Sequence, residues 1–154
     1  METLEAKIRS VVEQYASNGY LFNEGASDSE LASFIARCQE KLGHRPPSEY
    51  LEVLKRFDGM VVEGVFLYST TSRSLAGTKS FTLDFLEMNM LSREDDFMTN
   101  FLFFGDSDQD VYVFDILAGE YQVRDKQAFD NVYEQFYSFS GLLAHMVDLM
   151  LSRV

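Results

Sequence analysis

Cysteine, long apolar runs and basic residues are all scarce in this chain, and each scarcity excludes a class of protein. Cys38 is the single cysteine, so no disulfide can form within the chain and a reducing compartment is expected. The longest apolar runs are four residues, far short of the ~20 that a transmembrane helix needs. The charged N-terminus METLEAKIRSVVEQ lacks the apolar stretch of a secretory signal. The sequence therefore predicts a cytoplasmic protein with no membrane span.

The shortage of basic residues leaves the chain strongly acidic. It has 25 acidic and 13 basic side chains, which give a net charge of -12. A polyanionic surface repels the phosphate backbone of nucleic acids and attracts basic proteins. Nucleic-acid binding is therefore disfavoured and a basic protein partner is favoured, although the same charge also serves plain solubility.

Tryptophan is absent, but other aromatic residues are abundant. The 154 residues include 14 Phe and 8 Tyr, and 46% of the chain is apolar, which is far more than a disordered chain carries. A chain of this length can bury roughly 70% of its unfolded surface in one domain. We expect a single domain over residues 1–154 with a core of phenyl rings.

Residues 101–124 give the clearest structural signal. Three short aromatic and β-branched runs, at 101–104, 111–116 and 120–123, are separated by turns with Gly or Asp. Within 111–116 the alternating side chains make one wholly apolar face and a second face that ends in Asp115. These runs predict three antiparallel strands in a meander, whose apolar face the flanking segments must cover.

Helices are predicted on both sides of this meander. The box from Ser27 to Glu30 spells S-x-x-E, a typical helix start. Apolar stripes at helical spacing lie at 4–15, 31–42, 50–57, 83–90 and 142–151. A strand is expected at 65–68, and the aromatic side chains of 132–139 are expected to pack in the core against the sheet. The fold class is therefore α+β: a largely antiparallel sheet half-wrapped by N-terminal helices and a C-terminal helix.

Two acidic clusters and one isolated acid are candidates for a protein-binding site. The candidates are Glu63, Glu94, Asp95, Asp96, Asp106, Asp108 and Asp110. The last three form D-x-D-x-D, but an EF-hand loop starting there needs Gly and Glu where Val111 and Leu117 stand, so calcium is disfavoured. This turn is either hydrated, with Asp side chains bonding their own backbone, or part of an acidic rim for a basic partner.

No catalytic, cofactor or metal site is predicted. Cys38 lies within an apolar helical stripe and is interpreted as a small buried residue. His44 and His145 are isolated and have no cysteine nearby, so they do not indicate zinc. The motifs G-x-S-x-G, G-x-G-x-x-G and the P-loop are missing from the sequence, and we expect a protein that is not an enzyme.

Two segments together resemble a known family. In residues 45–68, Pro46-Pro47 open a helix that ends at Asp58-Gly59, and Gly64 leads into a strand. In residues 101–125, an apolar strand, Gly-Asp and a polar turn lead into two further strands. This order resembles the SUKH superfamily, which includes fungal cell-wall-assembly regulators and bacterial toxin-immunity proteins, and the spacing is most similar to its YrhA-like bacterial branch. The resemblance implies a family-like core over 45–150, preceded by a helical part over 1–43.

The resemblance also implies binding of a partner protein without catalysis. The first hypothesis is an immunity protein that neutralises a basic toxin domain, such as a nuclease, by covering its active site with an acidic surface. The alternative is a regulatory or assembly module with a different protein partner. The sequence leaves the oligomeric state open.

Overall fold

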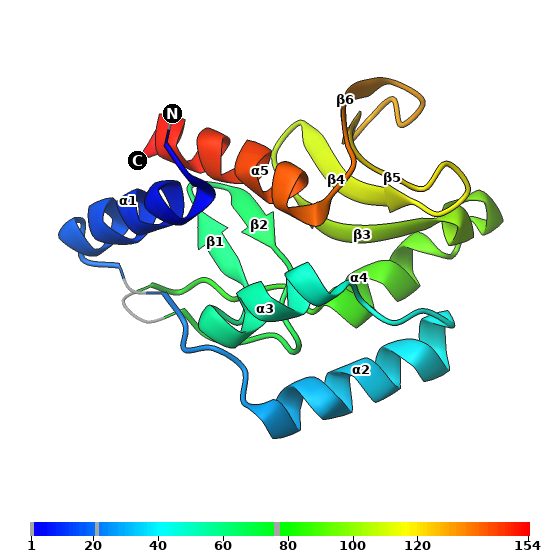
Figure 1. The fold of residues 1–154 in the computed structure, drawn as a ribbon, viewed down its shortest axis with the longest axis horizontal. Coiled ribbons are helices and arrows are strands. Elements are labelled where there is room, and N and C mark those ends of the chain that lie inside the picture. The colour runs from blue at the N-terminus through cyan, green and yellow to red at the C-terminus, as the bar shows by residue number, and fades with distance from the viewer. Residues whose placement is uncertain (1, 21, 76–77) are drawn as a thin grey trace.

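The meander predicted over 101–124 is present, and it forms the centre of a larger sheet. The computed structural model describes residues 2–20, 22–75 and 78–154. Each strand pairs antiparallel with the next strand in the chain. The strands are β1 Met60–Val62, β2 Val65–Leu67, β3 Phe101–Asp106, β4 Asp110–Asp115, β5 Glu120–Asp125 and β6 Val132–Phe136 (Figure 1). β1 is absent from the sequence prediction because three apolar residues after a turn are too short to show a period.

The helices also follow the predicted order and confirm the α+β class. They are α1 Leu4–Ser17, α2 Asp28–Leu42, α3 Ser48–Arg56, α4 Phe85–Ser92 and α5 Phe139–Arg153, with a 3-10 turn η1 at Asp96–Asn100. At the start of α2, the Ser27 hydroxyl accepts from the Glu30 N–H, and the Glu30 carboxylate accepts from the Ser27 N–H. The predicted capping box is therefore present.

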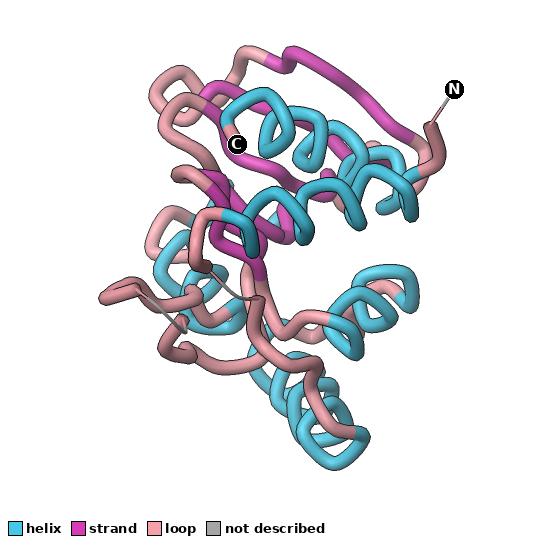
Figure 2. Tube along the Cα trace, turned by 90° about the vertical axis from the view of Figure 1, so that its left-hand side faces the viewer, coloured by secondary structure: helices cyan, strands magenta, loops and turns pink. Residues whose placement is uncertain are grey.

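One face of the sheet is covered by α5, and α1 lies beside α5 (Figures 1 and 2). Met146 of α5 packs against β3 at Gly105. A Cβ atom there would lie 2.1 Å from the Phe66 carbonyl oxygen and 2.9 Å from Met146 Cε. Any larger residue at this position would therefore clash with the backbone of β2 and force β2 away from β3.

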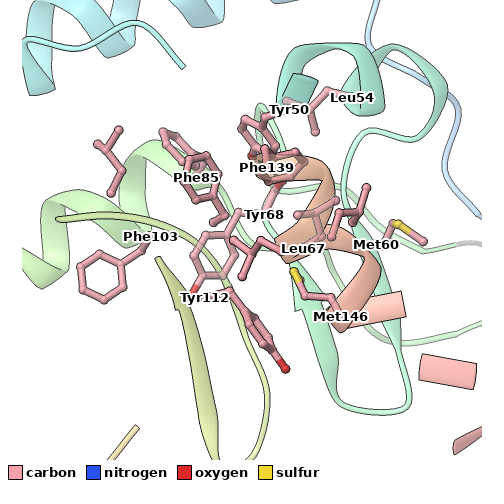
Figure 3. Close-up of a cluster of buried hydrophobic side chains, with 14 of the residues drawn as sticks. Tyr50, Leu54, Met60, Leu67, Tyr68, Phe85, Phe103, Tyr112, Phe139 and Met146 are labelled. Carbon is pink, nitrogen blue, oxygen red and sulfur yellow. Dashed lines mark hydrogen bonds between the residues drawn. The ribbon is translucent and has the colours of Figure 1, made fainter. Parts of the chain in front are cut away.

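The core is built on phenyl rings around Tyr50, as Figure 3 shows. The Tyr50 side chain is fully buried, and its ring centroid lies 5.0 Å from Phe104, 5.3 Å from Phe85 and 5.4 Å from Phe139. Its hydroxyl donates to the carbonyl oxygen of Tyr68 at 2.6 Å. One side chain of α3 thus joins α4, α5 and the sheet, and its only polar atom is satisfied.

The buried carboxylate of Asp58 ties the turn after α3 to the segment that precedes α4. It accepts from the Thr70 N–H at 2.8 Å, the Thr70 hydroxyl at 2.7 Å and Arg73 Nε at 2.5 Å. Arg73 also pairs with Glu30 at the start of α2. This carboxylate is fully engaged in holding the chain together.

Asn89 fixes α4 to the sheet. Its amide nitrogen donates to the Phe103 carbonyl oxygen, and its amide oxygen accepts from the Phe103 N–H, both at 2.8 Å. The side chain thereby replaces a neighbouring strand at a point on β3 that β2 does not reach. Phe85 and Asn89 form the buried face of α4, whereas Met90 is 44% exposed. Leu83 and Leu86 are partly buried against the core, so Met90 is the member of the stripe predicted over 83–90 that does not pack inside.

A second correction concerns the aromatic residues after β5. Phe139 is fully buried, but Tyr133 is 54% and Tyr137 99% exposed. The prediction that the aromatic side chains of 132–139 pack in the core is therefore wrong for these two residues. β6 is the last strand of the sheet, so side chains on its outer side and beyond its end meet solvent.

Candidate protein-binding surface

The turn between β3 and β4, here called the acidic turn (Asp106–Asp110), contains three of the predicted site residues. Asp106 is only 7% exposed. It accepts a hydrogen bond from the Tyr68 hydroxyl at 2.5 Å, and Lys126 Nζ lies 3.3 Å from its other oxygen. Burial and the Asp106 carboxylate together raise the pKa of Tyr68. Asp106 is therefore turned into the protein and is not displayed on the surface.

Asp108 is exposed, but a basic side chain from the last helix neutralises it. Arg153 donates to the Asp108 carboxylate at 2.7 Å and to the Glu63 carbonyl oxygen at 3.0 Å. The Arg153 hydrogen bond is the main reason that the pKa of Asp108 lies below its usual range. Arg153 thus brings the β1–β2 turn, which holds Glu63, next to the acidic turn. The Glu63 side chain is exposed and borders a hollow of about 680 Å³ beside α1.

Asp110 is partly buried at the start of β4. Burial raises its pKa, and the nearby carboxylates of Asp108 and Asp125 raise it further. Asp125 in turn accepts from the Tyr133 hydroxyl at 2.6 Å, the first cause of its lowered pKa. The acidic turn is thus dense in charge, but most of that charge has a hydrogen-bond donor within the molecule.

The second acidic cluster has different surroundings. Glu94, Asp95 and Asp96 are all exposed between α4 and η1. Among the ion pairs of the described residues, none includes any of the three. The Asp95 carboxylate accepts from the Phe97 N–H at 3.0 Å and so caps η1. The three carboxylates are therefore exposed to solvent with no basic side chain paired to them in the described part of the chain.

Large exposed apolar side chains gather around this second cluster. Met90, Leu91 and Phe97 are 44%, 55% and 50% exposed, and Leu117 in the β4–β5 turn is 79% exposed. The β4–β5 turn lies beside η1, because the Ile116 N–H donates to the Asn100 carbonyl oxygen at 2.9 Å. Both are at the right-hand end of Figure 1. We call this surface the α4–η1 patch, and its members are Met90, Leu91, Glu94, Asp95, Asp96, Phe97 and Leu117.

Aromatic rings support Phe97 from beneath. Its ring centroid lies 5.5 Å from that of Phe101 and 6.4 Å from that of Phe129. The Arg124 guanidinium lies 4.6 Å from both the Phe101 and Phe129 rings and donates to the Phe129 carbonyl oxygen at 3.0 Å. The half-exposed Phe97 ring thus packs against side chains that are themselves held in place. Phe97 therefore loses little side-chain freedom when a partner covers it.

The predicted site residues therefore fall into two places. Glu63 and the acidic turn lie together near the C-terminus of α5, whereas Glu94, Asp95 and Asp96 lie at the opposite end of β3. A six-residue strand spans roughly 17 Å. Sequence reasoning missed the apolar members of the α4–η1 patch, although an aromatic residue directly after an acidic run was a usable signal.

Reactive and metal-binding groups are sparse in the described part of the chain. Cys38 is buried as predicted, and burial raises the pKa of its thiol to about 12. Within the described ranges, no group of three or more His, Cys, Asp or Glu side chains is placed to hold a metal ion. None of the helices in these ranges combines the length and apolarity needed to span a membrane.

The fold and the comparison with protein families agree on the class of protein. A family model described as SMI1-KNR4 cell-wall matches residues 33–139, more than half of the chain. The chain belongs to the SUKH superfamily, within its SMI1-KNR4 family. This match confirms the resemblance seen in 45–68 and 101–125, while the YrhA-like branch stays a prediction. A search of curated proteins finds no significant match.

Proposed function

We propose that this protein is a non-catalytic, cytoplasmic immunity protein that neutralises a basic toxin domain by binding over its active site. Membership of the SUKH superfamily carries this proposal, since the family is known for toxin immunity and cell-wall regulation. The net charge of -12 supports a basic partner. A nuclease is the toxin class that fits best, because its active-site cleft must be basic to hold a phosphate backbone.

The mechanism is occlusion. An acidic surface accelerates the encounter with a basic cleft, and apolar side chains at the contact then slow dissociation. No group of the immunity protein needs to react. What is required is a rigid surface, and the ring cluster around Tyr50 and the strand-like contact of Asn89 with Phe103 provide one.

Co-expression tests the proposal directly. A candidate toxin domain is taken from the gene next to this chain in its native genome, it is expressed with and without the protein, and cell growth is followed. We expect growth arrest by the toxin alone and recovery with the protein, together with a stable complex on gel filtration. Arrest in both cultures, with no complex, would refute the proposal.

A regulatory role is the second candidate, because the matched family description refers to the cell wall. In this case the protein binds a component of a wall-assembly complex. Deletion of its gene would then alter cell-wall integrity in a strain that lacks the neighbouring toxin gene. The immunity function predicts no wall defect in that strain.

A further inference from the structure

The proposed function leaves open which surface grips the partner. We propose that the α4–η1 patch is that surface, and that it receives a protein domain that displays Lys and Arg side chains around an apolar recess. This inference rests on the proposed function and adds the place of contact and the chemistry of the contacting face.

Charge is unevenly distributed along the chain, and the patch lies in its most acidic part. Residues 80–123 contain ten acidic and one basic side chain, which leaves fifteen acidic and twelve basic for all other residues. That one basic residue, Arg93, has its Nε and one terminal nitrogen buried. Three of these ten acids, Glu94, Asp95 and Asp96, belong to the patch, and they form no ion pair within the described residues.

The apolar side chains of the patch make it more than an acidic cluster. Of the seven large apolar side chains that are exposed in the described ranges, four belong to the patch. Phe97 is the natural anchor, since its ring rests on Phe101 and is half exposed. Buried aromatic anchors surrounded by a polar rim are the usual energetic centre of a protein interface.

A second copy of this chain is a poor occupant. In a two-fold contact the same patch would face itself, and the carboxylates of Glu94 and Asp96 would meet their own counterparts. Like charges brought together without a counter-charge oppose association. A partner with complementary basic side chains has no such penalty.

Two pairs of variants separate the patch from the rest of the acidic surface. Glu94→Lys with Asp96→Lys reverses two patch charges and leaves the capping residue Asp95 in place. Glu13→Lys with Glu40→Lys makes the same change in net charge at exposed positions on α1 and α2. Phe97→Ala removes the anchor, and Tyr137→Ala removes an exposed aromatic ring elsewhere.

The probe is an inactive variant of the toxin domain encoded beside this chain, and affinity is measured by calorimetry. We expect Phe97→Ala to weaken binding about 30-fold, and the Glu94→Lys/Asp96→Lys pair to slow association about tenfold at low salt. The two control variants should bind within about twofold of the wild type. Thermal unfolding of every variant shows whether it is folded.

The outcomes separate this inference from the proposed function. If the wild type binds the toxin domain and the patch variants bind equally well, the patch is wrong and the immunity function stands. If the wild type does not bind, both fail. Loss of binding in folded patch variants alone supports both. Should Phe97→Ala not fold, the charge pair, which touches only exposed side chains, decides the question.

Discussion

The two acidic regions of this protein are both rich in carboxylates but have opposite surroundings. In the acidic turn, Asp106 is buried against Tyr68 and Lys126, and Asp108 is paired with Arg153. In the α4–η1 patch, three acids are exposed without an ion pair among the described residues, and apolar side chains lie around them. A run of acidic residues in the sequence therefore need not place negative charge on the surface. Two carboxylates of the acidic turn are engaged within the molecule, whereas the three carboxylates of the patch are exposed to solvent.

The largest expected effect is on stability, from Asp106→Ala. The substitution leaves the buried Tyr68 hydroxyl without its acceptor. An unsatisfied buried group of this kind costs about 2–3 kcal/mol in the free energy of unfolding, equivalent to a fall in Tm of roughly 5–10 °C. Urea and thermal unfolding measure it. Unchanged stability together with lost toxin binding would contradict this assignment, because Asp106 would then act at the interface.

A smaller effect is expected in the salt dependence of binding. Unpaired surface charges steer association, and salt screens them. The association rate of the wild type should fall about tenfold between low salt and about 0.5 M salt. The Glu94→Lys/Asp96→Lys pair should flatten this dependence, whereas Asp108→Asn should preserve it. Stopped-flow mixing with the inactive toxin domain measures both, and a flatter curve for Asp108→Asn would reverse the assignment.

Arg153→Met removes the cation that pairs with the acidic turn. Asp108 and the Glu63 carbonyl oxygen lose their shared donor. We expect a fall in Tm of about 2 °C, measured by differential scanning fluorimetry, with toxin affinity unchanged. An affinity loss as large as that of Phe97→Ala would place the contact at the C-terminus of α5 instead of the patch.

The smallest effect is expected from Asp108→Asn, and it depends on pH. The Arg153 hydrogen bond lowers the pKa of Asp108 in the folded protein. A lowered folded-state pKa stabilises the fold above the unfolded-state value of about 3.9, and this contribution is lost as pH falls through the folded-state pKa. The substitution should therefore lower Tm slightly at pH 7 and have a smaller effect as the pH falls below about 3.9. An equal or larger loss of Tm at acid pH would contradict the pairing.

Local signals explain what the sequence could predict. Ser27 and Glu30 specify the start of α2 through contacts three residues apart, and the alternation in 111–116 specifies β4. Such features need only neighbouring residues. The family resemblance in 45–68 and 101–125 also depends on order and spacing within the chain, and the match to residues 33–139 confirms it.

Long-range contacts explain what the sequence could not predict. The partner of Asp108 lies 45 residues away in α5, and the donor to Asp106 lies 38 residues away after β2. No spacing rule links such pairs. The exposed face of α4 was missed for the same reason, since the buried Asn89 side chain bonds the backbone of Phe103, 14 residues further along the chain.

The most direct test of the account is hydrogen–deuterium exchange of the protein with and without the inactive toxin domain. The account predicts new protection in residues 88–100 and in the β4–β5 turn at 116–119. Little change is expected in the acidic turn at 106–110. Protection confined to the acidic turn and to Glu63, with residues 88–100 exchanging as in the free protein, would contradict it.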